Sequence, residues 1–261
     1  MIAIILTAIM LFPVYWMINV SFTRRASIRK GDLVPRDFTV EHYAVVLRDQ
    51  LPHLATSLLI GLGTVALTLL LAAPAAYGLS KLPFPGSRGL AFGLIVAQMV
   101  PAVVMSLGFY SIYTRLGILN TVPGLIVADS TIAVPFAVML LTAFMTGIPR
   151  EMVEAARIDG ASHGRVFWSV VLPLSRNSLI TVSLFAFLWS WSDFIFASTL
   201  NREGGSLRPI TMGIYDYIGA QNQEWGPMMA TAVVASIPAA VLLVVAQKYV
   251  AAGVTAGAVK D

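Results

Sequence analysis

The residues of this chain that are best placed for chemistry lie in one polar stretch, 154–174, between two apolar regions. Its distinctive residues are Glu154, Ala155, Ala156, Asp159, Gly160, Leu172 and Pro173. The two carboxylates can accept hydrogen bonds from a partner's arginine or backbone N–H groups. The two alanines let another surface approach the backbone closely. The pattern therefore indicates docking onto a partner and not a chemical reaction.

The same stretch predicts two short helices joined by a glycine. Pro149 suits the first turn of a helix, where its missing N–H is not needed, and Gly160 can end that helix in the left-handed conformation. Ser162 can cap a second helix, which Pro173 ends or bends. We expect a helix–glycine–helix elbow on the membrane surface. An amphipathic interfacial helix with no partner is the alternative.

The composition is that of a polytopic membrane protein. Hydrophobic residues make up 57% of the chain and charged residues 11%, against roughly 25% charged residues in soluble domains. The basic residues are scattered and form no phosphate-tracking stripe, so we expect no nucleic-acid partner. The chain has no cysteine, which excludes disulfides and thiolate sites. The three histidines, His42, His53 and His163, share no ligand-like spacing, and we expect no metal site.

Uncharged stretches of about 20 residues predict membrane-spanning helices. We expect an all-α integral membrane protein that forms one domain, 1–261, with six transmembrane helices. The predicted spans are 2–20, 56–80, 89–112, 122–147, 177–200 and 227–247, with a polar loop at 148–176 and a small, flexible C-terminal tail at 248–261. Arg and Lys are divided almost equally between the two sides, so the positive-inside rule does not decide the orientation.

Several stretches together resemble a known family. The spacing of Glu-Ala-Ala, Gly and Leu-Pro resembles the EAA loop of ABC-importer permeases. The stretches AAYGLSKLPFPG (75–86), QMVP (98–101), LGILNT (116–121), AFLWSWSDF (186–194) and GVTAGAVK (253–260) resemble permease subunits of bacterial carbohydrate ABC importers of the maltose-transporter type. The resemblance covers the whole chain. Asn177 departs from it, because many members have a proline soon after Leu-Pro.

The resemblance implies a multi-pass permease of the bacterial cytoplasmic membrane that imports a sugar, by default a disaccharide or short oligosaccharide. It places the loop 148–176 in the cytosol as the coupling segment. It also implies that the tail contacts the ATPase through Gly253, Thr255, Gly257 and Lys260. The implied partners are a second homologous permease, two copies of an ABC ATPase subunit, an extracytoplasmic sugar-binding protein (lipoprotein or periplasmic) and membrane lipid.

The same resemblance implies that ATP and Mg belong to the ATPase subunits, and we expect this chain to bind no cofactor. No G-x-x-x-x-G-K-[ST] phosphate loop occurs in the sequence, so the chain cannot hydrolyse ATP by that route. We expect a transport subunit and not an enzyme.

Polar and aromatic residues within the spans are candidates for the translocation path. A carboxylate in a membrane usually faces a cavity or a partner. We favour a helix-end position at the outer interface for Asp129, and for Asp193 a helix end and a path-lining position are equally open. Trp189, Trp191 and Gln98 could contact sugar, although tryptophan in a membrane helix more often packs or anchors at an interface.

Two other classes of protein fit the sequence less well. A proton-coupled secondary carrier would show inverted repeats and several buried carboxylates or histidines, and we find neither. An intramembrane enzyme would need a clustered acid–base pair, a nucleophile motif such as G-x-S-x-G or an H-E-x-x-H pair, and we expect none of these.

Overall fold

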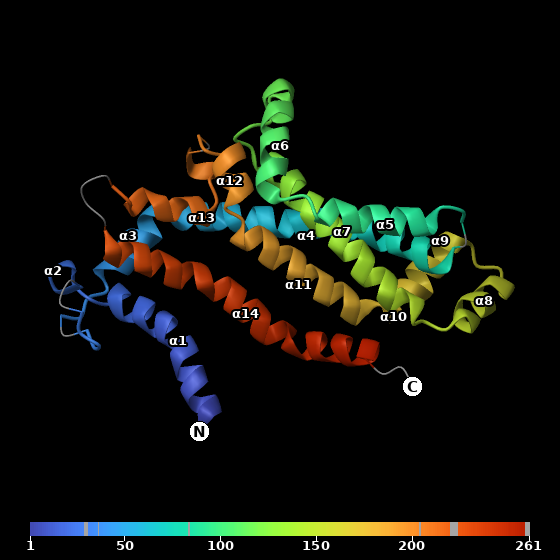
Figure 1. The fold of residues 1–261 in the computed structure, drawn as a ribbon, viewed down its shortest axis with the longest axis horizontal. Helices are drawn as coiled ribbons and strands as arrows, with labels where there is room; N and C mark the ends of the chain where they lie inside the picture. Colours follow the sequence, from blue (N-terminus) through green and yellow to red (C-terminus); the bar gives the residue numbers. More distant parts are fainter. Residues whose placement is uncertain (29–30, 36, 83, 204, 220–223, 259–261) are drawn as a thin grey trace.

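The computed structural model describes residues 1–28, 31–35, 37–82, 84–203, 205–219 and 224–258. These residues form helices and contain no β-strand; an isolated bridge joins Thr23 and Phe38. Four helices are long and apolar enough to cross a membrane: α1 (Ile2–Ser21), α4 (Leu51–Lys81), α7 (Val122–Thr146) and α14 (Trp225–Ala258). Figure 1 shows α4, α7 and α14 running along the long axis of the molecule.

Two further candidate spans are sharply bent. Helix α5 (Ser87–Gln98) meets α6 (Ala102–Leu116) at 94°, and the segment His163–Leu174 meets α11 (Arg176–Ser192) at 78°. The part of the chain that the structure describes thus holds four spans, or up to six if each bent pair counts as one. The all-α fold agrees with the sequence, and the count of six stays a prediction.

The helix predicted at 89–112 is interrupted between Gln98 and Ala102, and its prediction as one span stays open. Pro101 lacks an N–H and disfavours helical geometry in the residue before it, and its own ψ of 134° is extended. Helix α6 therefore leaves the body of the molecule almost at a right angle (Figure 1).

The expected span at 177–200 is also interrupted. Helix α11 ends at Ser192, Asp193 is extended, and α12 (Ile195–Leu200) begins a new helix. At the C-terminus, the flexible tail expected from residue 248 is instead helical, because α14 continues to Ala258. Alanine and valine dominate this segment, and its two glycines do not stop a helix that is already formed.

Helix α4 is the centre of the structure and packs against α7 and α11. Its glycines allow this close approach: a Cβ on Gly63 would lie 2.4 Å from Ile126 of α7, and one on Gly61 would lie 2.8 Å from Phe187 of α11. Small residues at such contacts are typical of membrane helix packing. The remaining short elements are α2 (Arg25–Ile28), α3 (Glu41–Asp49), α8 (Arg150–Ile158), α9 (His163–Val166), η1 (Phe167–Val171), α10 (Leu172–Leu174), η2 (Gly205–Leu207), α13 (Ile210–Gly213) and η3 (Ile214–Tyr217).

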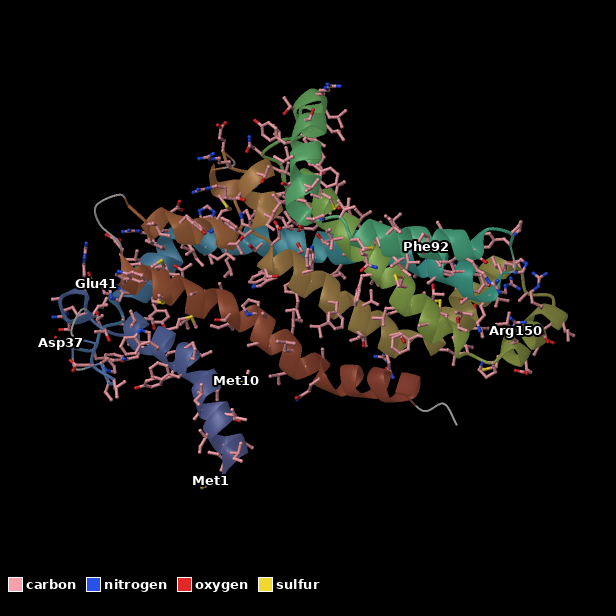
Figure 2. The ribbon with its side chains drawn as sticks, viewed as in Figure 1. Met1, Met10, Asp37, Glu41, Phe92 and Arg150 are labelled. Atoms are coloured by element: carbon pink, nitrogen blue, oxygen red, sulfur yellow. The ribbon has the colours of Figure 1, made fainter. Side chains whose placement is uncertain are left out.

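The outer surfaces of the long helices are strongly apolar. In α1 most side chains before its last two turns are exposed, including Ile4 and Met10, and the exposed face of α6 carries Val104 and Leu107. Figure 2 shows the side chains of α1 projecting into open space on several sides of that helix. Such large apolar surfaces are unstable in water and stable against lipid or other membrane helices.

Candidate functional site

The polar elbow lies at one end of the molecule. Helix α8 follows α7 and projects beyond the helix bundle, and Arg150 at its start marks this end in Figure 2. Three of the predicted docking residues on α8 and its end, Glu154, Ala155 and Asp159, are exposed, and Ala156 is half-buried. The structure therefore presents this predicted group on one protruding helix.

Local hydrogen bonds explain why the first helix stops where it does. Gly160 has φ of +83°, a conformation that glycine adopts without a steric cost. Its N–H donates to the carbonyl of Arg157 at 3.1 Å, and the N–H of Ala161 donates to the carbonyl of Ala156 at 3.0 Å. This pair of bonds is the Schellman motif, which satisfies the last carbonyls of a helix. The left-handed glycine that the sequence predicts is thus present.

The second arm of the elbow begins at a capped helix, as predicted. The hydroxyl of Ser162 accepts a hydrogen bond from the N–H of Arg165 at 3.3 Å. The helix then passes through a π-helical turn, η1, whose residues Phe167 and Val171 are buried. Leu172 is half-buried against the same core, Pro173 is exposed, and the chain bends into α11 after Leu174. A π-turn at this position is of interest because such turns occur often at functional sites.

The exposed face of α8 combines charged and apolar side chains. The side-chain carboxylates of Glu154 and Asp159 make no hydrogen bond or ion pair with another described residue. Asp159 lies at the C-terminal end of the helix, where a negative charge is disfavoured by the helix dipole. Ile158, at 86% exposure, is a further residue of this face that the sequence did not single out. An exposed isoleucine between two carboxylates suits a partner that offers apolar surface and cations.

The segment 160–164, Gly-Ala-Ser-His-Gly, fits the letters of the G-x-S-x-G nucleophile motif. The sequence therefore does contain such a pattern, contrary to the expectation above. That motif requires a strand-to-helix turn that exposes the serine. Here α8 precedes it, and the hydroxyl of Ser162 caps α9. The geometry is that of a helix cap and not of a nucleophile.

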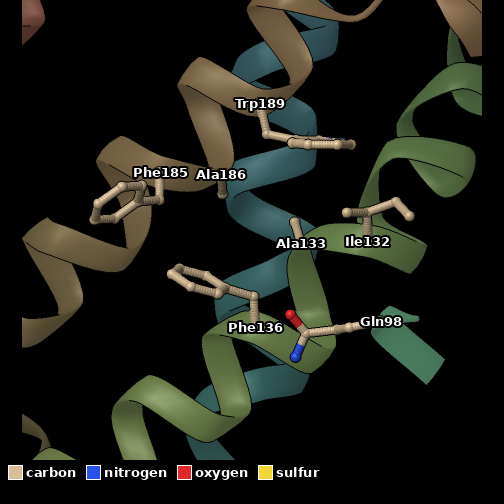
Figure 3. A pocket seen from close by; sticks show the side chains of 7 residues that line it. All are labelled: Gln98, Ile132, Ala133, Phe136, Phe185, Ala186 and Trp189. Carbon is tan, nitrogen blue, oxygen red and sulfur yellow. The ribbon is translucent and has the colours of Figure 1, made fainter. Parts of the chain in front are cut away.

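A pocket of about 300 Å³ lies in the membrane-spanning part of the molecule. Its lining residues come from α5, α7 and α11 and are Gln98, Ile132, Ala133, Phe136, Phe185, Ala186 and Trp189. Figure 3 shows the Trp189 and Phe136 rings at its edge and Gln98 approaching from the neighbouring helix. The amide nitrogen of Gln98 lies 3.1 Å from the sulfur of Met139. The pocket thus offers aromatic faces and one amide.

Two of the four predicted path residues, Gln98 and Trp189, share this pocket, and the other two do not line it. Trp191 is buried, stacks on Phe187 at 5.3 Å and donates from Nε1 to the carbonyl of Ala235. Its place is in the packing between α11 and α14. Phe136 and Phe185, which pack edge to face at 5.4 Å, are pocket residues that the sequence did not single out. No sequence signal distinguishes them from other apolar residues of the spans.

Asp193 is a helix-end carboxylate. Its side chain accepts hydrogen bonds from the N–H groups of Phe196 at 3.2 Å and Ala197 at 2.9 Å. These bonds satisfy donors that the first turn of α12 would otherwise leave free. Asp193 therefore explains why the helix can restart after the break, and the path-lining alternative is not supported by its contacts.

Asp129 does not lie at a helix end, and this expectation is wrong. It lies within α7, is 1% exposed, and accepts a hydrogen bond from the hydroxyl of Ser190 at 2.5 Å. His42 and His53 are buried as well and bond to the backbone carbonyls of Thr23 and Arg208. Buried titratable groups are therefore more numerous than the sequence indicated, because burial depends on neighbours that are distant in the chain.

The described residues contain no group of three or more His, Cys, Asp or Glu that could hold a metal ion. What the structure offers is a membrane-embedded helical body with a polar elbow at one end. These features are those of a polytopic membrane protein, and comparison with known proteins identifies the family.

Residues 68–256 match the family described as binding-protein-dependent transport system inner membrane component. The chain belongs to this family. It is a multi-pass protein of the cytoplasmic membrane, a transport component, and it works in a system that depends on a binding protein.

The chain is 32% identical to the trehalose transport system permease protein SugB of Mycobacterium tuberculosis, over 96% of this chain and 92% of that protein. It is 30% identical to the trehalose/maltose transport system permease protein MalG of Thermococcus litoralis, over 99% and 94%. Its fold is similar to a chain in the crystal structure of a bacterial ABC transporter that imports alginate. That match has a TM-score of 0.82 and 23% identity, and it covers 95% of this chain and 93% of the other.

Proposed function

We propose that this chain is one of two homologous permease halves of an ATP-driven ABC importer of a disaccharide or short oligosaccharide. The observation that carries the proposal is the elbow 148–176. It projects from the bundle, ends its first helix in a Schellman motif at Gly160, and leaves Glu154 and Asp159 without a partner among the described residues. Such a surface suits an ATPase subunit that presents cations.

The proposed complex contains this chain, a second homologous permease, two copies of an ABC ATPase subunit and an extracytoplasmic sugar-binding protein. ATP and Mg bind to the ATPase subunits. Closure of these subunits on ATP moves the elbow of each permease, and rigid-body rocking of the two permeases opens the path outward and inward in turn. The exposed apolar surfaces of α1 and α6 suit lipid and the second permease.

A sugar is the proposed substrate for two reasons. Relatives are named as permeases for trehalose, diacetylchitobiose and maltose. The pocket beside Gln98 and Trp189 also offers aromatic rings, which can stack on the apolar face of a sugar ring, and an amide that can bond to hydroxyl groups. We propose that this pocket is part of the path on this chain's side.

The test is to purify the chain from its native membranes and identify the proteins that accompany it. We expect a second permease and an ABC ATPase, and we expect ATP-dependent uptake of a di- or oligosaccharide in proteoliposomes that also contain the binding protein. The chain purified free of the ATPase is expected to hydrolyse no ATP. A chain that drives sugar uptake alone on a proton gradient would support the proton-coupled carrier instead.

A further inference from the structure

Helix α4 joins the two ends of the molecule in one element. It runs from Leu51 to Lys81 without a break, although Pro74 lies inside it. At about 1.5 Å per residue its 31 residues extend roughly 45 Å. It packs along α7 and α11 at the contacts of Gly61 and Gly63 described above. It is therefore one continuous helix, here called the rod, that packs against α7 on one side and α11 on another.

The inner end of α4 is bonded directly to the elbow. The ammonium group of Lys81 donates a hydrogen bond to the carbonyl of Ile148 at 2.5 Å. Ile148 lies between the end of α7 and the start of α8, at the root of the elbow's first arm. One turn back, the ring of Tyr77 packs against Phe167 in the second arm, with ring centroids 5.3 Å apart. Both arms of the elbow are thus joined to the same end of α4.

The outer end of α4 is bonded to the loop between α12 and α14. His53 contributes a hydrogen bond from Nδ1 to the carbonyl of Arg208 at 2.8 Å, and the hydroxyl of Ser57 accepts from the N–H of Ile210 at 2.8 Å. The fit is close, because a Cβ on Gly213 would lie 2.1 Å from Oε1 of Gln50. The backbone of this loop is therefore fixed to the first two turns of α4.

We propose that α4 transmits movement between the cytosolic elbow and the outer loop 205–217. Lys81 is the positioning residue at the inner joint, and Ser57 and His53 hold the outer joint. The inference rests on the proposed function, because it assigns a route for the coupling that an importer needs. The physical argument is that a continuous helix is rigid along its axis, and that both loops are attached to it by hydrogen bonds to their backbone.

The experiment uses the complete complex reconstituted in proteoliposomes. Four quantities are measured for each variant: assembly, thermal stability, basal ATP hydrolysis, and the stimulation of hydrolysis by sugar-loaded binding protein. Lys81→Met keeps the aliphatic stem and removes the donor. We expect it to lower stimulation about tenfold, the equivalent of one charge-assisted hydrogen bond, with assembly and basal hydrolysis unchanged. Lys81→Arg should restore most of the stimulation, and Arg88→Met, at an exposed cation of the same end, should have none of this effect.

A double variant tests whether the two joints act through one rod. Ser57→Ala removes the acceptor for Ile210 and should lower stimulation by a smaller factor than Lys81→Met. Independent sites this far apart contribute additively. If α4 carries the signal, ATP hydrolysis in the double variant should be stimulated as much as in Lys81→Met alone. The reason is that detaching the second end of a helix that is already detached at the first causes no further loss of coupling.

Full stimulation of ATP hydrolysis in Lys81→Met at normal assembly would overturn the inference. So would a double variant whose stimulation falls by the product of the two single-variant factors. If Lys81→Met fails to assemble, Ser57→Ala alone decides: full stimulation of ATP hydrolysis in Ser57→Ala at normal assembly also overturns the inference. A wild-type complex that takes up no sugar would contradict the proposed function and not the role of α4.

Discussion

The polar elbow and the membrane pocket differ in how far apart their residues lie in the chain. The elbow's cap is made by neighbours, with Gly160 bonded to Arg157 and Ser162 to Arg165. The pocket draws Gln98, Phe136 and Trp189 from three different helices. A short motif can therefore specify the first site by itself, whereas the second exists only when the helices pack. The predictions below test this contrast.

The largest effect is expected from Gly160→Pro, because proline forbids positive φ and removes the N–H that bonds to Arg157. Sugar uptake and assembly with the ATPase should both be lost, while membrane insertion stays normal because the residue is outside lipid. Sugar uptake and assembly with the ATPase are each normalised to the expression level of the variant. Gly160→Ala is the matched control: a Cβ there meets nothing within 4 Å, so it should retain part of the activity despite backbone strain of about 1–2 kcal/mol. Wild-type uptake in Gly160→Pro would remove the elbow from the mechanism.

Glu154→Lys should weaken docking of the ATPase. It places a cation where an acceptor is expected, and a lost charge-assisted contact is worth roughly 1.5–3 kcal/mol, about ten- to a hundredfold in affinity. Affinity of the purified ATPase for the permease pair measures this. Glu151→Lys, at an exposed acidic residue of the same helix, is the control for charge alone. An equal loss in both would show that the site recognises net charge and not Glu154.

Truncation after Gln247 should leave membrane insertion intact and reduce the stimulation of ATP hydrolysis by loaded binding protein. The removed segment includes the predicted contacts Gly253, Thr255 and Gly257, which lie in the helical end of α14, and Lys260, which lies outside the described residues. Stimulation is compared with the full chain at equal assembly. Normal stimulation would exclude the tail from coupling.

The smallest effect is expected from Trp189→Ala in the pocket. Loss of one aromatic contact is worth about 0.5–1.5 kcal/mol, so the apparent affinity for sugar in transport should fall about two- to tenfold at unchanged expression. Trp191→Ala is the contrasting variant: this side chain is packed against Phe187 and α14, and its loss should cost about 3–5 kcal/mol of stability. Unaltered transport kinetics in Trp189→Ala would mean that the pocket does not touch the sugar.

The outcome of the sequence predictions follows the same division. The left-handed Gly160 and the cap at Ser162 were predictable because each needs only a residue type and a bond to a near neighbour. The break at Pro101 had a local signal, but the sequence did not say that the helix would resume at 94°. The helix restarts after Asp193 because that carboxylate accepts hydrogen bonds from the N–H groups of α12. From the sequence alone, a charged residue within an apolar stretch fits a helix cap and a path-lining residue equally well.

Composition, apolar stretches and the elbow motif by themselves determined an all-α membrane protein with a polar helix–glycine–helix elbow, because lipid solvation and helix capping act on residues that are close in the chain. Only the tertiary structure decided that Asp129 is buried against Ser190, that Trp189 faces a pocket while Trp191 packs, and that Lys81 holds Ile148. Each of these depends on which faces of α4, α7 and α11 meet. In spans that are apolar all round, the sequence pattern carries almost no information about those faces.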